Sequence, residues 1–508
     1  MKDKDSRRLG ALLALLLLWG GFLIFRTSFV AEDGKRYFCL FDDAMISMTY
    51  ARNLVEGHGL NWARQGDPVE GFTHPLWLVP MVSANLLPVE LRLRSLPVQL
   101  LSLSVLVLLV LAVRSLMLSW FSGEWMPAVA MTAFCYPLAC WSILGMETGL
   151  QALLAVVAVH LAIASVEGRR ERHLELWAVC AAAYLLRMDM LLLVLAVQAW
   201  VMAHGGLRRE RRRWLLGLGL FLGVALGYQA FRWFYFHDLL PNTYYLKMTG
   251  VPLGVRLLRG FLSLELFARG HLPLLLAAAV GTVVLLRRNR RLALPAGIFL
   301  LYCAYNVWVG GDAWEVGEEI PLRANRYIAF VLPLLFVLLN GILNRALEVR
   351  KSAWAAGVLG VLLVNGLWPG GRDADWRWMA GIRRPPQVES HRTVLRQLRR
   401  MQRTVRPGAV VATAWAGIPA YFSDYRMVDI LGFNDRHVAR SPSRTPDPRL
   451  FRPGHDRWDF DYLLGRVRPD AFFQVWKGLR MEGVKVGELM TGAGYRRHRG
   501  IWLKRGSP

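Results

Sequence analysis

Long apolar runs alternate with short charged segments over the first 371 residues of the chain. Each run holds about 17–22 residues, close to the roughly 20 that a helix needs to cross a bilayer. The stretch 174–203 is also apolar but contains Arg187 and Asp189, so it forms either one long helix with buried charges or two short helices. Counted once, it brings the prediction to about eleven transmembrane helices. The uninterrupted runs are 9–25, 71–89, 95–113, 125–146, 148–166, 214–231, 270–286, 292–311, 327–344 and 352–371.

The pattern changes at about residue 372, and the rest of the chain has no run long enough to span a membrane. Residues 388–406 are typical of an amphipathic basic helix. Four segments are typical of β-strands bounded by turn residues, namely 409–413, 427–431, 470–474 and 500–504. We therefore expect a membrane all-α domain over residues 1–371 and a soluble α/β domain over residues 372–508.

Composition supports the membrane interpretation. Hydrophobic residues make up 54% of the chain and charged residues 19%, against about 25% charged residues in soluble domains. The net charge of +25 comes mainly from arginines clustered between apolar runs, which favours cytoplasmic loops of a membrane protein over a nucleic-acid-binding surface. The cluster at 169–172 falls on the wrong side of this topology, so the number of spans in 119–203 stays open.

The loop between the first two runs, residues 26–72, carries the densest chemistry. Asp42 and Asp43 are adjacent carboxylates close to the expected membrane surface. Partial burial and a like-charged neighbour both raise the pKa of a carboxyl group, which suits it to take a proton from a hydroxyl nucleophile. The second carboxylate can orient the first or hold a divalent cation. The alternative is structural: Asp42 caps the helix that runs through Met48, and Asp43 interacts with its dipole.

Three fragments of this loop resemble the first periplasmic loop of GT-C fold glycosyltransferases that use polyprenyl-phosphate sugars. The resemblance is greatest to the mycobacterial terminal arabinofuranosyltransferases. Phe72 and His74 replace the tyrosine and serine that are usual there, and neither change removes an acidic residue. The fragments are Asp42-Asp43-Ala44, Gly57-His58-Gly59-Leu60-Asn61-Trp62 and Val69-Glu70-Gly71-Phe72-Thr73-His74-Pro75-Leu76-Trp77.

Later fragments resemble the same family in the same order along the chain. One of them, around Arg187, has methionine where the family usually has proline. They are Gly145-Met146-Glu147-Thr148, Leu186-Arg187-Met188-Asp189, Pro241-Asn242-Thr243 with Lys247, Gly310-Gly311-Asp312 with Arg326-Tyr327, and Val428-Asp429 with Asn434-Asp435.

The resemblance implies an inverting enzyme of the bacterial inner membrane, with its active site and C-terminal domain on the periplasmic side. It would transfer one sugar, arabinofuranose by closest likeness, from a polyprenyl phosphate to an extracytoplasmic glycan, lipid or protein. Asp42 and Asp43 are the implied catalytic residues. The candidates for binding the donor phosphate are Arg187, Lys247 and Arg326, and those for binding substrate are Arg52, Glu70, His74, Glu147, Asp189, Asn242, Asp429 and Asn434.

Each candidate also has a structural alternative. Arg187 within an apolar stretch is expensive and so faces a cavity or a partner, but it also fits a simple pair with Asp189. Lys247 and Arg326 also suit anchors at the membrane interface, while Asn242 suits a turn. A divalent cation (Mg²⁺, Mn²⁺ or Ca²⁺) held by Asp43 and Glu70 is the expected cofactor, if any.

Two other functions are compatible with the sequence. A transporter or flippase of lipid-linked sugars would also use intramembrane Arg and Asp residues, but the chain lacks evident inverted repeats. A non-catalytic protein of envelope glycan assembly would keep the fold without the reaction. We expect membrane lipids and the donor lipid as partners, and no nucleic acid.

Overall fold

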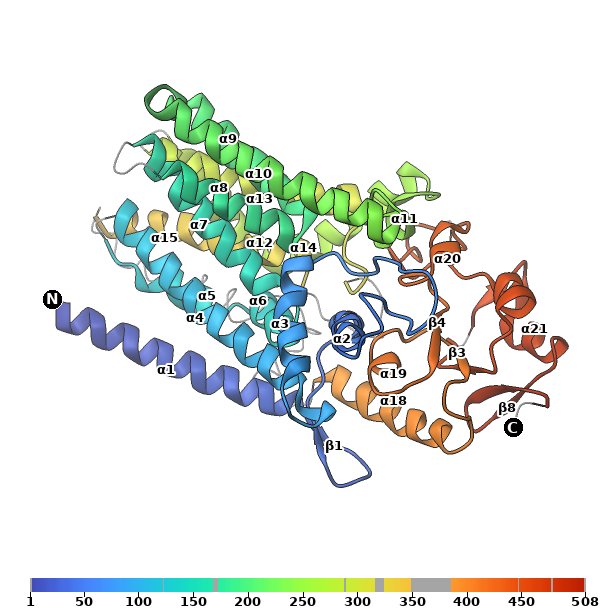
Figure 1. Cartoon of the computed structure of the whole chain (residues 1–508). Helices are drawn as coiled ribbons and strands as arrows, with labels where there is room; N and C mark the ends of the chain where they lie inside the picture. The colour runs from blue at the N-terminus through green and yellow to red at the C-terminus, as the bar shows by residue number, and fades with distance from the viewer. Residues whose placement is uncertain are drawn as a thin grey trace. The chain divides into compact units, whose positions relative to one another are not determined.

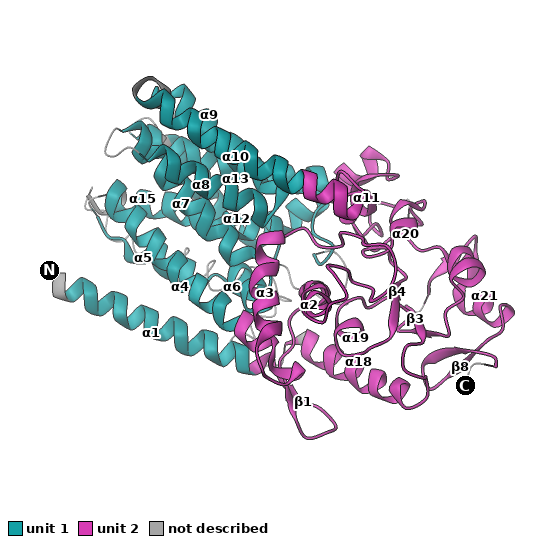
Figure 2. Cartoon of the chain, viewed as in Figure 1, with its two compact units in different colours: residues 1–25, 99–229, 260–383 teal, residues 26–98, 230–259, 384–508 magenta. Residues whose placement is uncertain are grey.

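The computed structural model describes residues 2–121, 123–167, 172–286, 289–315, 324–348, 385–445, 447–476 and 478–506. The chain divides into two compact units, coloured separately in Figure 2. Unit 1 comprises residues 1–25, 99–229 and 260–383, and unit 2 comprises residues 26–98, 230–259 and 384–508. The expected domain boundary at residue 371 and the expected span 352–371 lie outside the described residues.

The helices that make up most of unit 1 follow the apolar runs of the sequence (Figure 1). α13 ends where Gly310 adopts φ 88°, a left-handed conformation that suits glycine and stops a helix. These helices are α1 (Lys2–Arg26), α4 (Ser95–Trp120), α5 (Met126–Ala133), α6 (Tyr136–Ile143), α7 (Thr148–Val166), α8 (His173–Leu186), α9 (Leu191–Ala203), α10 (Gly206–Phe236), α12 (Leu253–Leu286), α13 (Ala293–Val309), α14 (Arg326–Ala329) and α15 (Leu332–Glu348), with 3-10 turns η2 (Met188–Met190) and η3 (Arg290–Leu292).

Among the described residues, five helices are long and apolar enough to cross a membrane. A sixth span results if the pair α5 and α6, bent by 43°, counts as one. Four shorter apolar helices, Pro75–Leu86, His173–Leu186, Met188–Ala203 and Leu332–Asn344, add to them. The chain is thus a multi-pass membrane protein, and the figure of eleven spans stays a prediction.

The stretch 174–203 forms two helices, α8 and α9. Arg187 separates them with extended backbone angles of φ −158° and ψ 134°. The second of the two alternatives for this stretch is therefore the observed one, and the break falls at its charged residues.

Unit 2 joins the first loop to the end of the chain. Its N-terminal part contains β1 (Phe29–Val30), β2 (Arg36–Tyr37), α2 (Asp42–Val55), α3 (Pro75–Leu86) and η1 (Leu91–Leu93), and α11 (Asn242–Met248) comes from its middle segment. Its C-terminal part contains α18 (Pro386–Gln402), β3 (Val410–Thr413), α19 (Ile418–Tyr421), β4 (Arg426–Asp429), α20 (Arg436–Arg440), η4 (Tyr462–Val467), β5 (Ala471–Phe473), β6 (Arg480–Met481), β7 (Val484–Lys485), α21 (Val486–Gly492), β8 (Tyr495–His498) and β9 (Ile501–Lys504).

A five-stranded sheet in the order β4-β3-β5-β9-β8 organises this C-terminal part. β3 pairs in parallel with β4 and β5, whereas β9 pairs antiparallel with β5 and β8. The four segments expected to be strands coincide with β3, β4, β5 and β9, and the expected basic helix coincides with α18.

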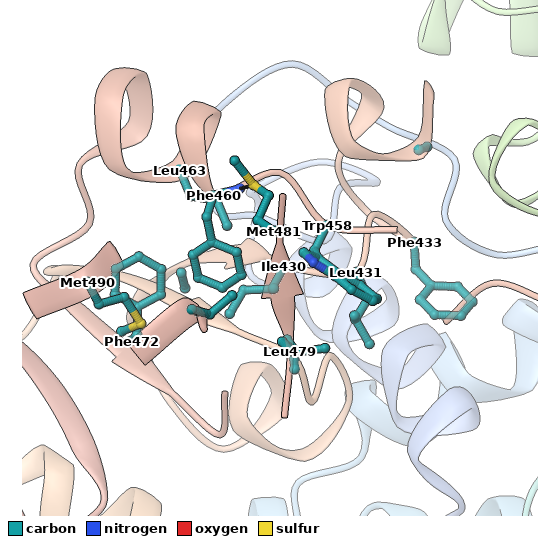
Figure 3. Close-up of a cluster of buried hydrophobic side chains, with 14 of the residues drawn as sticks. Ile430, Leu431, Phe433, Trp458, Phe460, Leu463, Phe472, Leu479, Met481 and Met490 are labelled. Carbon is teal, nitrogen blue, oxygen red and sulfur yellow. Dashed lines mark hydrogen bonds between the residues drawn. The ribbon is translucent and has the colours of Figure 1, made fainter. Parts of the chain in front are cut away.

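One face of the sheet packs on a cluster of buried apolar side chains (Figure 3). Phe472 on β5 has no exposed surface, and its ring lies 5.9 Å from that of Phe460 between centroids. Ile430 and Leu431 follow β4 directly, so this cluster holds the end of β4 in place.

Replacing Phe472 by alanine should therefore destabilise the sheet by about 3–5 kcal/mol, because it leaves a cavity in a closed core. Denaturant unfolding of the full chain in detergent, followed by circular dichroism, measures this loss. Val484→Ala is the matched control, since Val484 is 40% exposed. An unchanged midpoint for Phe472→Ala would contradict this assignment of the core.

Candidate active site

The two carboxylates of the first loop lie in the first turn of α2. Phe41 is the N-cap residue and makes no side-chain cap, so the alternative that Asp42 caps this helix is wrong. The Asp42 carboxylate instead accepts two backbone hydrogen bonds from the C-terminal part of the chain. Gly417 N–H donates to Oδ2 at 3.2 Å, and Ile418 N–H donates to Oδ1 at 3.0 Å.

The surroundings of Asp42 shift its titration toward neutral pH. Burial is the largest cause and raises the pKa of Asp42 to about 7. The neighbouring charge of Asp43 raises it further, while the two backbone N–H groups oppose the shift. A carboxyl group with this pKa exchanges protons near neutral pH, as a general base requires.

Glu70 pairs with an arginine that the sequence analysis did not single out. Arg232 Nε donates to Glu70 Oε2 at 2.5 Å, and Nη2 donates to Oε1 at 3.1 Å. Both side chains are 1% exposed. The pairing fixes the loop that leads from Glu70 into α3, because a buried charge pair cannot separate without great cost.

Two further candidates connect the first loop to distant segments of unit 2. The Asn242 amide donates to the carbonyls of Gly432 and Phe433 at 2.8 and 3.0 Å, and its backbone N–H donates to Glu70 O at 2.9 Å. Asn434 Oδ1 accepts a hydrogen bond from Tyr50 Oη at 3.0 Å. These contacts give the loop from Glu70 a fixed place against the end of β4.

Asp429, the last residue of β4, holds the loop that contains Asn434. Its carboxylate accepts hydrogen bonds from the backbone N–H groups of Leu431, Gly432 and Asn434, and from the Asn434 amide. Burial raises the pKa of Asp429 to about 6 despite these donors. Its charge also acts on Asp42, raising the pKa of that residue slightly. Asp429 and Asn434 therefore shape the site.

Arg52 and His74 are buried among protein partners. Arg52 donates from Nη1 to the carbonyls of Tyr421 and Ser423 at 2.7 and 3.1 Å, and it pairs with Glu56 and Asp424. His74 is the residue just before α3, and its Nε2 lies 2.8 Å from Oγ of Ser47 on α2. These contacts favour structural roles, and substrate contact by either residue stays a prediction.

Lys247 lies near the end of α11 and carries an ammonium group. Among the described residues, no carboxylate pairs with its ammonium group, which lies 5.9 Å from the Phe433 ring centroid. It belongs to the same compact unit as Asp42. An unpaired ammonium group is ready to bind an anion.

The remaining candidates lie in unit 1 and form two ion-paired groups. At the break between α8 and α9, Arg187 donates to Asp189 Oδ2 at 2.6 Å and to Glu147 Oε1 at 2.8 Å. Arg326 is paired with Asp312, with 3.3 Å between Nε and Oδ1. The expected association of Arg187 with Asp189 is present, together with a second carboxylate.

The next question is whether the side chains around Asp43 and Glu70 offer ligands for a divalent cation. Within the described ranges, no group of three or more His, Cys, Asp or Glu side chains could hold a metal ion. The Glu70 carboxylate is already occupied by Arg232. Asp43 and Glu70 therefore do not form a ready-made metal site, and the divalent cation stays a prediction.

Sequence reasoning missed Arg232 and Gly417. Arg232 directly follows the apolar run 214–231. A single arginine at the end of such a run is typical of an anchor at the membrane–water interface. Gly417 contributes only a backbone N–H and the absence of a side chain, neither of which gives a signal in a single sequence. An arginine ending a span could have been examined as a partner for a loop carboxylate.

Comparison with solved structures identifies the fold. A crystal structure of ArnT from Cupriavidus metallidurans in the apo state covers 92% of this chain and 93% of its own, with 14% identity and a TM-score of 0.54. A second, of the same ArnT bound to undecaprenyl phosphate, gives the same coverage with 13% identity and a TM-score of 0.56. The chain has the ArnT fold. The expected GT-C architecture is thereby confirmed.

The other two comparisons add one match. Residues 381–497 match the family described as "Domain of unknown function (DUF8728)". No curated protein matches the sequence. The arabinofuranosyltransferase subtype therefore depends on the resemblance of the sequence fragments alone.

The Glu70–Arg232 pair predicts strongly coupled effects on stability. Arg232→Met and Glu70→Gln each leave a buried group without its partner and should cost about 3–5 kcal/mol. The double variant should cost clearly less than the sum of the two. Thermal unfolding of the detergent-solubilised chain measures all three. Lys35→Ala, which removes a solvent-exposed pair with Glu90, serves as the control and should change little. Additive effects of the two buried substitutions would argue against the pairing.

Proposed function

We propose that this chain is an inverting glycosyltransferase that moves one sugar from a polyprenyl phosphate to a hydroxyl group of an extracytoplasmic acceptor. The observation that carries the proposal is Asp42, a first-loop carboxylate with a pKa raised to about 7, on the ArnT fold. The ArnT structure with bound undecaprenyl phosphate supports a polyprenyl phosphate as the lipid for this chain as well.

The reaction follows from the chemistry of a carboxylate base. The Asp42 carboxylate accepts the proton of the acceptor hydroxyl while that oxygen attacks the anomeric carbon of the donor sugar. The bond between the anomeric carbon and the phosphate oxygen breaks, and its electron pair leaves with the polyprenyl phosphate. A single displacement of this kind inverts the anomeric centre. Burial, with a smaller contribution from the charge of Asp43, raises the pKa of Asp42 to about 7, which suits proton transfer near neutral pH.

The departing phosphate gains negative charge and needs a cation. Lys247 suits this role because it shares a compact unit with Asp42 and has no carboxylate partner among the described residues. Arg187 and Arg326 are already paired with carboxylates, so a phosphate would have to compete for them. We assign the phosphate contact to Lys247, and Arg187 and Arg326 stay candidates on the strength of the family resemblance.

We further propose arabinofuranose as the sugar, because the first-loop fragments resemble terminal arabinofuranosyltransferases most. The same resemblance supports an inner-membrane location with the site facing the periplasm. The acceptor is a glycan, a lipid or a protein of the cell envelope. Transport of lipid-linked sugar and non-catalytic assembly are the outcomes that the next experiment separates from transfer.

Asp42→Asn combined with Asp43→Asn should abolish transfer, because a general base contributes about 10²–10⁴-fold to rate. Mass spectrometry of envelope glycans, lipids and proteins compares this double variant with the wild type and with a deletion strain. The double variant and the deletion should lose the same single-sugar mass, of a pentose if the sugar is arabinofuranose. Asp67→Asn, an exposed carboxylate of the same loop, is the control. A full glycan pattern in the double variant, together with a loss in the deletion, would favour a transporter or an assembly protein.

The pKa of Asp42 also predicts the pH dependence of transfer. The base acts unprotonated, so kcat/KM should fall about tenfold per pH unit below about pH 7 and level off above it. The same shift has the opposite sign for stability: the folded state holds this proton more tightly than the unfolded chain, so the contribution is full below pH 3.8 and is lost as the pH rises through about 7. A flat profile between pH 5 and pH 8 would contradict the assignment of Asp42 as the base.

A further inference from the structure

Residues 414–418 follow β3, and the last two of them contact the Asp42 carboxylate. We call them the β3 loop. Gly417 and Ile418 donate their backbone N–H groups to different oxygens of Asp42, at 3.2 and 3.0 Å. The two donors lie 375 and 376 residues after Asp42 in the sequence. The contact exists only because unit 2 folds the end of the chain onto its first loop.

The contact between Gly417 and Asp42 leaves no space for a side chain. A Cβ atom at position 417 would lie 2.2 Å from the Asp42 carbonyl oxygen and 2.5 Å from Asp42 Oδ1. Both distances are far below van der Waals contact. At Gly417 φ is −87°, outside the left-handed region that favours glycine. The three atoms nearest to a Cβ at this position all belong to Asp42.

Other side chains of unit 2 hold the β3 loop and the short helix after it. Trp62 Nε1 donates to the Ala416 carbonyl at 2.9 Å, and both residues are buried. At the end of α19 and just after it, Arg52 donates to the carbonyls of Tyr421 and Ser423. Two residues of α2, Asp42 and Arg52, therefore contact residues 417–423 from positions ten residues apart on the helix.

Two hydrogen bonds leave the carboxylate able to react. Its two oxygens together offer about four lone-pair positions, and the β3 loop uses one on each oxygen. No other hydrogen bond to this carboxylate is present among the described residues, so the remaining positions can accept one from a hydroxyl group. The titratable groups around the carboxylate are Asp43 on the same helix, Asp429 at the end of β4, and Cys39 before α2. Fixed backbone donors therefore orient the reacting group without supplying a competing proton.

We propose that the β3 loop is a positioning element of the transfer reaction: the amides of Gly417 and Ile418 hold the Asp42 carboxylate in the orientation that receives the acceptor proton, and glycine at 417 is what permits this contact. The inference rests on the proposed function, since it assigns an aid to the base. It gives the C-terminal part of the chain a direct share in the chemistry.

Gly417→Ala is the direct test. The added methyl group must push the β3 loop or the carboxylate aside, and a displacement of about 1 Å at a reacting group can cost about 10²-fold in rate. The assay follows transfer from a labelled polyprenyl-phosphate arabinofuranose into membranes of the deletion strain. We expect kcat to fall about 10- to 100-fold with an unchanged KM for the donor. The thermal midpoint should fall as well, because the clash disturbs buried contacts, while the variant stays folded at the assay temperature. Gly492→Ala is the matched control, because nothing lies within 4 Å of a Cβ at that position.

Trp62→Phe gives a second, gentler perturbation of the same loop. It removes the hydrogen bond to Ala416 and adds no atoms, so it keeps the proposal testable if Gly417→Ala does not fold. We expect the same pattern, a lower kcat at constant KM, with a smaller loss of about 3- to 10-fold. The proposal would be overturned if each of these two variants that folds had the kcat of the wild type.

Combining Gly417→Ala with Asp42→Asn shows whether the β3 loop acts through Asp42. In the Asp42→Asn chain, adding Gly417→Ala should leave the residual single-turnover rate unchanged, because the group being positioned is gone. An equal further loss in that background would show that Gly417 acts elsewhere and would overturn the proposal. Failure of the proposed function looks different, because wild type itself would then transfer no sugar from the labelled donor.

Discussion

The placement of the Asp42 carboxylate is the constraint on which unit 2 depends. A carboxylate removed from solvent destabilises the fold unless donors meet it, and here the donors are two amides from the other end of the chain. The same burial that demands those donors raises the pKa of Asp42 to about 7. The structural cost and the chemical usefulness of this residue therefore have one cause.

Buried polar contacts also connect the segments of unit 2. Glu70 with Arg232, Asn242 with the loop after β4, and Asn434 with Tyr50 join three segments that are remote in sequence. Such contacts are directional, so they fix the first loop more narrowly than apolar packing alone would. Asp429 contributes from the end of β4, where the apolar cluster of Figure 3 anchors the strand.

The sequence predicted the features that local patterns encode. The apolar runs marked the helices, the strand segments in the tail coincided with β3, β4, β5 and β9, and the first-loop fragments indicated the GT-C fold that the ArnT likeness confirms. Contacts made by backbone amides, such as those of Gly417, and the partner of Glu70 could not be predicted, because they depend on how distant segments meet. The helix cap assigned to Asp42 as an alternative was wrong for the same reason: its carboxylate turns to the β3 loop.

The role of Asp42 is tested most directly by a structure of the full chain with a non-hydrolysable phosphonate analogue of polyprenyl-phosphate arabinofuranose. We expect the anomeric carbon to lie next to Asp42, with space for one acceptor hydroxyl between them, and the phosphonate to contact Lys247. A sugar bound away from Asp42, with that carboxylate still closed against Gly417 and no path for an acceptor, would contradict the assignment of Asp42 as the base.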